Sequence, residues 1–146
     1  MAKEMVKHPD HYNKGLEVFK IIRSHRLGFF AGNAIKYICR AGLKSSDPEK
    51  IIEDLEKAVF YLLEEITESN KTSLLKRLIL KSNFNRAVDP ESFARSWELS
   101  LNRTNAVIFI LSTGDSMSKR VRSNFLNYGI EFLKDEIKKE KRNANN

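Results

Sequence analysis

A polar stripe runs along one side of a short predicted helix in the first half of the chain. No glycine, proline or turn cluster interrupts residues 33–41, and Gly42 follows where a left-handed residue ends a helix. At about 100° per residue, five hydrogen-bonding side chains fall in register: Asn33, Lys36, Tyr37, Arg40 and Lys44. A solvated helix face is the simpler explanation. However, cations without an intervening acid, above an apolar floor, suit a phosphate-bearing ligand, so we favour a binding role.

The apolar side of the same predicted helix carries the single cysteine of the chain, Cys39. One cysteine cannot form an internal disulfide, and Cys39 lies opposite the polar stripe, which argues against a catalytic thiol. Its use as a small core residue is typical of a protein from a reducing cytoplasm.

A long helix is predicted to start at Asp47-Pro48, with Asp as N-cap and Pro in the first turn. Its predicted apolar face contains Ile51, Ile52, Leu55, Val59, Leu62, Leu63 and Ile66. Asp54 and Tyr61 lie along one edge of that face, in a row with Ala58 and Glu65. A short loop makes the two helices antiparallel, so Asp54 and Tyr61 could complete a site with the polar stripe. The alternative for Asp54 is an ion pair with Arg40 or Lys36.

The polar segment His8-Pro9-Asp10-His11-Tyr12 precedes the first predicted helix, residues 17–25. Pro9 keeps this segment out of a helix. Three interpretations stay open: docking on neighbouring helices, a metal site that lacks a third ligand in sequence, or a cover that closes a ligand site over the polar stripe. We rank the cover above the metal, because imidazole and phenol groups serve as donors to phosphate or as stacking partners for a base.

Composition describes a globular chain with amphipathic helices. The 146 residues are 41% hydrophobic and 31% charged, which suits one or two small domains. No apolar run reaches the length of a membrane span, and the N-terminus lacks the apolar core of a signal peptide. The net charge is +7, and residues 1–70 hold 11 basic and 11 acidic residues, so the surplus falls in residues 71–146. A basic half can indicate nucleic-acid binding, although part of this charge lies in the terminal run of residues 138–142.

The second half of the chain repeats the pattern of the first, after a predicted linker at residues 69–73. Residues 104–114 follow residues 32–42 at an offset of 72. The matched pairs are Asn33 and Asn105, Ala34 and Ala106, Tyr37 and Phe109, and Gly42 and Gly114. Taken alone, residues 107–111 suggest a buried strand, but the repeat favours a buried helix.

The predicted second copy has lost the polar stripe. Ile108 replaces Lys36, Ser112 replaces Arg40, and Phe125 replaces Asp54 at an offset of 71. Keeping apolar positions while discarding polar ones is expected of a copy that contributes packing and binds no ligand.

Three blocks of residues carry a resemblance to a known family. They are His8-Pro9-x-His11-Tyr12, then Gly32-Asn33-Ala34-Ile35-Lys36-Tyr37-x-x-Arg40-Ala41-Gly42-x-Lys44, then Asp54-Leu55-x-Lys57-Ala58-x-x-Tyr61-Leu62. In order and approximate spacing they resemble a family of small bacteriophage proteins described as nucleotide kinase-like or as a domain of unknown function. The resemblance covers about residues 6–66 and leaves out the second half.

The family includes a nucleoside monophosphate kinase that acts on deoxynucleotides, forms a large oligomer and lacks the usual kinase loop. This chain likewise has no G-x-x-x-x-G-K-[ST] motif. The resemblance implies a nucleotide site made of His8, His11, Tyr12, Asn33, Lys36, Tyr37, Arg40, Lys44, Asp54 and Tyr61. In the leading hypothesis the three cations of the stripe hold phosphates, Asn33 and Tyr37 orient sugar or base, and the histidines close the site. Lys36 and Arg40 would act in phosphoryl transfer, with Asp54 as the candidate base.

We therefore predict an all-α fold of two tandem three-helix units. Residues 1–70 form the nucleotide-binding unit, and residues 71–146 form the degenerate structural copy. The expected function is that of a bacteriophage nucleotide-binding protein with kinase-like activity, using Mg²⁺ with ATP, in a homo-oligomer in the host cytoplasm. The first alternative is a non-catalytic protein that sequesters a nucleotide, since acids that could hold Mg²⁺ are scarce near the stripe. The second is a basic nucleic-acid-binding adaptor, which lacks aromatic residues between its cations.

Overall fold

The computed structural model describes residues 14–71, 88–113 and 118–145, and all regular structure within these ranges is helical. The predicted all-α class is confirmed. The six helices within these ranges are α2 (Val18–Ser24), α3 (Phe29–Arg40), α4 (Pro48–Lys71), α6 (Pro90–Ser96), α7 (Leu101–Leu111) and α8 (Lys119–Ala144). None of the helices in these ranges is both long and apolar enough to span a membrane.

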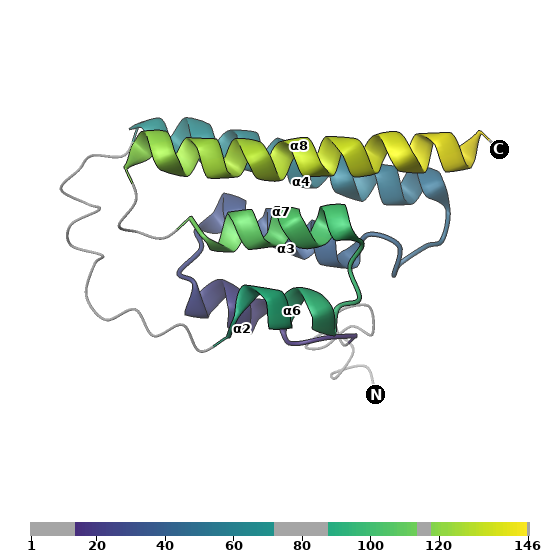
Figure 1. Cartoon of the computed structure of the whole chain (residues 1–146), viewed down its shortest axis with the longest axis horizontal. Helices are drawn as coiled ribbons and strands as arrows, with labels where there is room; N and C mark the ends of the chain where they lie inside the picture. The colour runs from purple at the N-terminus through teal and green to yellow at the C-terminus, as the bar shows by residue number, and fades with distance from the viewer. Residues whose placement is uncertain (1–13, 72–87, 114–117, 146) are drawn as a thin grey trace.

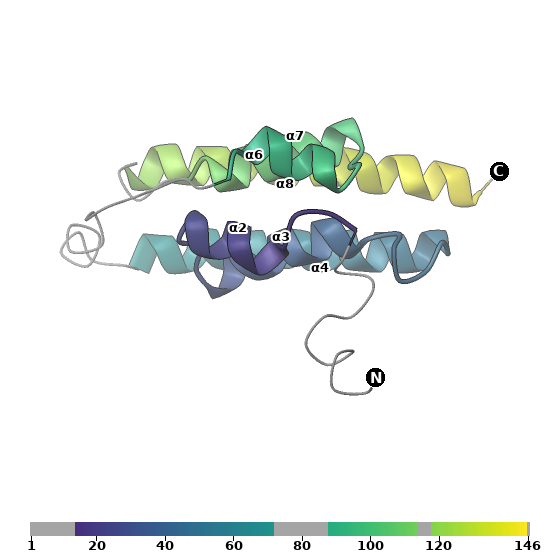
Figure 2. The ribbon, with the colours of Figure 1, turned by 90° about the horizontal axis from the view of Figure 1, so that it is seen from below.

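The helices form two layers (Figures 1 and 2). Helices α2, α3 and α4 make one layer, and α6, α7 and α8 make the other. The two long helices, α4 and α8, pack side by side. Two ion pairs show that they are antiparallel: Glu65 near the end of α4 pairs with Arg122 near the start of α8, and Glu56 near the start of α4 pairs with Lys141 near the end of α8. Each layer runs from a short helix to a long one, with 7, 12 and 24 residues in the first and 7, 11 and 26 in the second. The internal repeat itself stays a prediction.

The core lies between the layers and is built on α4. Leu55, Ala58 and Leu62 are fully buried there, as the predicted apolar face requires. Leu63 is an exception, because 49% of it is exposed, so placing it on the buried face was wrong. Asp54, Ala58 and Glu65 are buried as well, and Tyr61 is partly buried, because α4 is covered by α3 on one side and by α8 on another.

Helix α7 confirms the helical interpretation of residues 107–111. The Ser100 side chain accepts a hydrogen bond from the Arg103 backbone N–H and so caps the helix. Val107 and Ile110 are fully buried, which explains how a run rich in β-branched residues stays helical: burial outweighs propensity.

Two predicted boundaries differ from the structure. Helix α3 begins at Phe29, four residues before the predicted start, with Gly28 in the N-cap position. Helix α4 continues to Lys71, so the first part of the predicted linker, residues 69–71, is helical.

The chain before α2 is fastened to the second layer at the end of α6. The Trp97 indole Nε1 donates to the Leu16 carbonyl at 2.9 Å, and the Leu16 N–H donates to the Ser96 Oγ at 2.9 Å. A Cβ placed on Gly15 would lie 2.6 Å from the Trp97 ring and 2.7 Å from the Ser96 carbonyl oxygen. Only glycine fits this close approach of two backbones.

Candidate functional site

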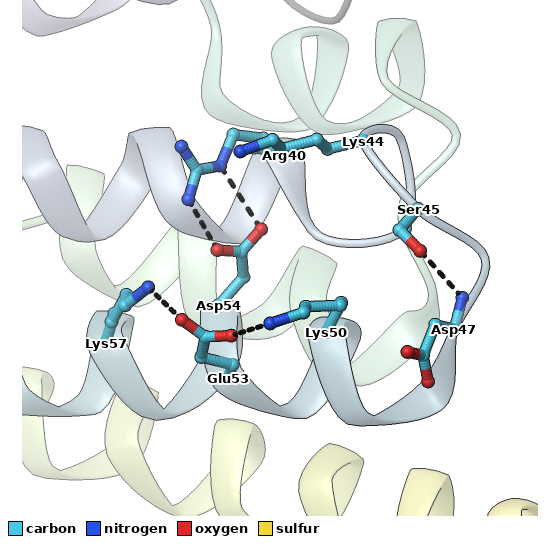
Figure 3. A pocket seen from close by; sticks show the side chains of 9 residues that line it. Arg40, Lys44, Ser45, Asp47, Lys50, Glu53, Asp54 and Lys57 are labelled. Atoms are coloured by element: carbon cyan, nitrogen blue, oxygen red, sulfur yellow. Dashed lines mark hydrogen bonds and ion pairs between the residues drawn. The ribbon is translucent and has the colours of Figure 1, made fainter.

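A polar hollow lies where α3 ends and α4 begins (Figure 3). We call it the α3–α4 hollow, and its volume is about 320 Å³. It is lined by the last turn of α3, the connecting loop and the first three turns of α4. Its lining residues are Arg40, Gly42, Lys44, Ser45, Asp47, Lys50, Glu53, Asp54 and Lys57. Four of them are cationic and three are acidic, so the hollow carries a small positive excess.

The inner wall of the hollow is an ion pair between α3 and α4. The Arg40 Nε donates to the Asp54 Oδ2 at 3.2 Å, and the Arg40 Nη2 donates to the Asp54 Oδ1 at 2.5 Å. Only 15% of the Arg40 side chain and 10% of the Asp54 side chain are exposed. The pair is the interaction that the sequence left open as the alternative for Asp54. Its fork geometry fixes the guanidinium plane.

The outer wall is a chain of ion pairs along α4 (Figure 3). The Glu53 carboxylate accepts from the Lys50 Nζ at 3.0 Å and from the Lys57 Nζ at 2.5 Å, at spacings of three and four residues. Hydrogen bonds from Lys57 and Lys50 lower the pKa of Glu53 to about 2. These three side chains are 42% to 64% exposed, so solvent screens the pairs and a ligand can rearrange them.

The loop between the helices gives the hollow its rim. Gly42 has φ +84°, the left-handed conformation predicted for the residue that ends the helix. The Asp47 carboxylate accepts the Glu49 N–H at 3.0 Å and so caps α4, as predicted, while the Ser45 hydroxyl accepts the Asp47 N–H at 3.1 Å. Lys44 is exposed and has no hydrogen bond or ion pair with any residue that the structure describes. Its side chain points back toward Arg40 (Figure 3).

An aromatic cluster adjoins the hollow on the side of α3. Tyr37 and Tyr61 stack with ring centroids 5.6 Å apart and an interplanar angle of 15°. The Arg40 guanidinium carbon lies 4.6 Å from the Tyr37 ring centroid, so the cluster begins directly beside the hollow. Phe29 and Phe60 meet Tyr61 edge-on, and they are 70% and 56% exposed.

The structure brings some of the predicted site residues together and separates others. Arg40, Lys44 and Asp54 line the hollow, while Tyr37 and Tyr61 lie in the aromatic cluster beside it. Lys36 and Asn33 do not line the hollow. The Lys36 Nζ lies 5.5 Å from the Tyr37 ring centroid, and the Asn33 side-chain amide donates to the Phe29 carbonyl of its own helix at 2.8 Å. His8, His11 and Tyr12 lie outside the described residues.

Sequence reasoning missed Lys50, Glu53 and Lys57 as parts of the hollow. Their spacing puts them on one face of α4, with Lys50 and Lys57 about one turn either side of Glu53, so the signal was present in the helical periodicity. It was overlooked because charged residues on a helix surface are usually solvated. The exposed Phe29 and Phe60 were also missed as neighbours of Tyr61, because the exposure of a side chain depends on which helices pack around it, and the pattern of a single helix does not give that.

The second layer has an aromatic cluster of its own. Phe109, the position that the predicted repeat matches with Tyr37, stacks on Phe132 with ring centroids 5.9 Å apart and an interplanar angle of 22°. Phe125, the position matched with Asp54, packs edge-on against Phe109 at 5.5 Å. If the predicted repeat holds, an aromatic ring therefore takes the place that a carboxylate has in the first layer.

The thiol of Cys39 and the metal-ligating side chains are two further places to look for chemistry among the described residues. Cys39 is 1% exposed, and burial raises the pKa of its thiol far above the usual range. Within residues 14–71, 88–113 and 118–145, no group of three or more histidine, cysteine or acidic side chains is placed to hold a metal ion.

Residues 6–63 match the model of DUF3310, a family of proteins of unknown function. The matched segment contains α2, α3 and most of α4, and thus every residue that lines the α3–α4 hollow. It ends before the second layer. No curated protein and no solved structure matches the chain. The match assigns no activity, so a bacteriophage origin and a nucleotide kinase-like function stay predictions.

Proposed function

We propose that this protein binds a nucleotide, with the phosphate groups in the α3–α4 hollow. The observation that carries the proposal is a hollow edged by four cations from three consecutive segments, directly beside stacked aromatic rings. Lys44 is available to an anion without breaking an ion pair to any described residue. Lys50 and Lys57 can turn from Glu53 to a phosphate at little cost, because exposed pairs contribute little stability.

The aromatic cluster supplies a surface for the base. Phe29 and Phe60 flank Tyr61 and are largely exposed, and aromatic side chains bind nucleobases by stacking. Because Arg40 touches both the Tyr37 ring and the hollow, one ligand can reach from the cations to the rings. This arrangement favours a nucleotide over a simple anion such as sulfate.

The activity we propose is that of a nucleoside monophosphate kinase without a P-loop, from a bacteriophage. This proposal comes from the resemblance of the three sequence blocks. It is supported by cations held on rigid helices, which can neutralise the charge of a transferred phosphoryl group. In this proposal Mg²⁺ enters with ATP, the protein acts in the host cytoplasm, and it assembles into a homo-oligomer.

A second candidate, a protein that sequesters a nucleotide without altering it, is favoured by the state of the acids. Two hydrogen bonds from Arg40 occupy both oxygens of Asp54, the residue predicted as base. In the ligand-free protein, hydrogen bonds from Lys57 and Lys50 lower the pKa of Glu53 to about 2, so Glu53 is a poor proton acceptor there near neutral pH. Before a ligand binds, neither Asp54 nor Glu53 is therefore prepared for proton transfer.

Calorimetric titration with a deoxynucleoside monophosphate and with ATP, each with and without Mg²⁺, tests the binding site. We expect Lys44→Ala to weaken binding about tenfold, the equivalent of about 1.4 kcal/mol. Lys20→Ala, which removes the same charge from α2 outside the hollow, should leave binding unchanged. Equal affinity in the two variants would remove the hollow as the site.

Product analysis separates the two functions. Incubation with a deoxynucleoside monophosphate and Mg-ATP yields a diphosphate if the protein is a kinase, and tightly bound, unaltered nucleotide if it sequesters. Salt-sensitive retention of DNA or RNA that survives Arg40→Ala would instead indicate the nucleic-acid adaptor.

A further inference from the structure

An arginine of the second layer donates hydrogen bonds to backbone carbonyls at the C-terminal end of α3. Arg103, in the first turn of α7, donates from Nε to the Ile38 carbonyl at 3.1 Å and from Nη2 to the Ala41 carbonyl at 3.0 Å. Its Nη2 also contacts the Ile38 carbonyl. Carbonyls at a helix C-terminus have no partner within the helix, and a cation there is favoured by the helix dipole. Arg103 therefore replaces the missing intrahelical bonds.

The carbonyls that accept from Arg103, those of Ile38 and Ala41, lie directly before the loop that forms the rim of the α3–α4 hollow. Ala41 is followed by Gly42, whose left-handed conformation turns the chain, and then by Lys44. The Leu43 N–H closes this turn by donating to the Arg40 carbonyl at 2.9 Å. The direction of the Ala41 carbonyl thus sets the direction in which the loop leaves the helix.

The opposite end of α3 is held from the second layer as well, but through an intermediary. Gly28 occupies the N-cap position and offers no side chain to the first turn. The Glu65 Oε2 accepts the Ala31 N–H at 3.2 Å instead, and the Arg122 Nη2 from α8 donates to the Glu65 Oε1 at 2.7 Å. Both ends of the helix that carries the polar stripe therefore depend on an arginine beyond residue 71.

We propose that Arg103 is a positioning residue for the α3–α4 hollow, and that it fixes the turn that presents Lys44 to the ligand. This inference rests on the proposed function. The two nitrogens that Arg103 uses lie in one rigid plane and reach two carbonyls together, which a lysine ammonium cannot do in the same geometry. The second half of the chain thus contributes orientation of the site as well as apolar packing.

The test compares Arg103→Met with Arg122→Met. Each substitution removes one partly buried arginine that holds an end of α3, so both should lower the melting temperature. We expect Arg103→Met to weaken ATP binding, measured by calorimetry, about tenfold more than Arg122→Met. An equal loss in both variants, or no loss in Arg103→Met, would overturn the positioning role. Arg103→Lys retains the charge and serves if the methionine variant does not fold, with an intermediate loss expected.

A ligand-free measurement separates this inference from the proposed function. We expect hydrogen exchange at the Leu43 amide to accelerate in Arg103→Met and in Arg103→Lys, and to stay at the wild-type rate in Arg122→Met. If the wild-type protein binds no nucleotide but this pattern is seen, the proposed function fails and the grip on the turn stands. If Leu43 exchange is unchanged in both Arg103 variants, the positioning role fails even if the nucleotide binds.

Discussion

The Arg40–Asp54 pair allows the sharpest quantitative test of the site. The perturbation is a double-mutant cycle of Arg40→Ala, Asp54→Ala and the double variant, followed by urea denaturation at pH 7. Both side chains are at least 85% buried and share two hydrogen bonds. Breaking a fully buried pair costs about 3–5 kcal/mol because the remaining charge is stranded. Because a small part of each group still reaches water, we expect each single substitution to lower the free energy of unfolding by about 2 kcal/mol.

The double variant carries the decisive number. Removing both groups leaves no stranded charge, so it should cost less than the sum of the two single variants, with a coupling free energy of about 1–3 kcal/mol. A coupling below about 0.5 kcal/mol, the usual limit of additivity, would refute the view that this pair is a rigid wall of the hollow. Ser112→Ala is the control. It alters the position that the predicted repeat matches with Arg40 and should change neither stability nor ligand affinity.

The same variants divide the pair by function. Arg40→Ala should lose nucleotide binding while its circular dichroism spectrum shows that the helical fold is intact. Asp54→Asn should keep or strengthen binding, because it removes a negative charge that competes with the phosphate for the guanidinium.

Three further outcomes are expected from features outside this pair. Gly15→Ala should lower the free energy of unfolding in urea by about 1–3 kcal/mol, because the new Cβ would lie 2.6–2.7 Å from Trp97 and the Ser96 backbone. Gly28→Ala, whose Cβ would have its nearest neighbour at 3.8 Å, should be near neutral, and equal stabilities of the two variants would contradict this. The Glu53 carboxylate should titrate by NMR near pH 2, so that its ion pairs contribute above pH 4.5 and are lost as the pH falls through about 2; a midpoint near 4.5 would show that the pairs do not form in solution. Cys39 should react with a thiol reagent only at the rate of unfolding, and fast labelling of the folded protein would place it at the surface.

The helices could be predicted from sequence because their signals are local. Asp47-Pro48 marked the start of α4, and Gly42 marked the turn that ends α3, each through backbone chemistry confined to a few residues. The pattern of residues 107–111 was ambiguous between strand and helix, and only comparison with another part of the chain resolved it correctly.

The hollow could be predicted only in part because it depends on contacts between elements. The antiparallel arrangement of two helices joined by a short loop was enough to bring Asp54 within reach of Arg40. Nothing in the local pattern, however, indicated that Arg103 would reach 65 positions back along the chain to Ile38. Lys36 shares a stripe with Arg40, yet one helical turn is enough to place it outside the hollow.

Helix α4 has a consequence for any attempt to isolate the segment that matches the family model. Leu55 and Leu62 are completely buried in a helix that packs against both α3 and α8, and each is worth about 1.5–3 kcal/mol when removed from water. A fragment that ends at residue 63 would lack α8, so the side of α4 that packs against α8 would be exposed to water. The boundary of sequence similarity is therefore not a boundary of autonomous folding. Residues 6–63 expressed alone should dimerise, aggregate or unfold unless another chain shelters the exposed leucines.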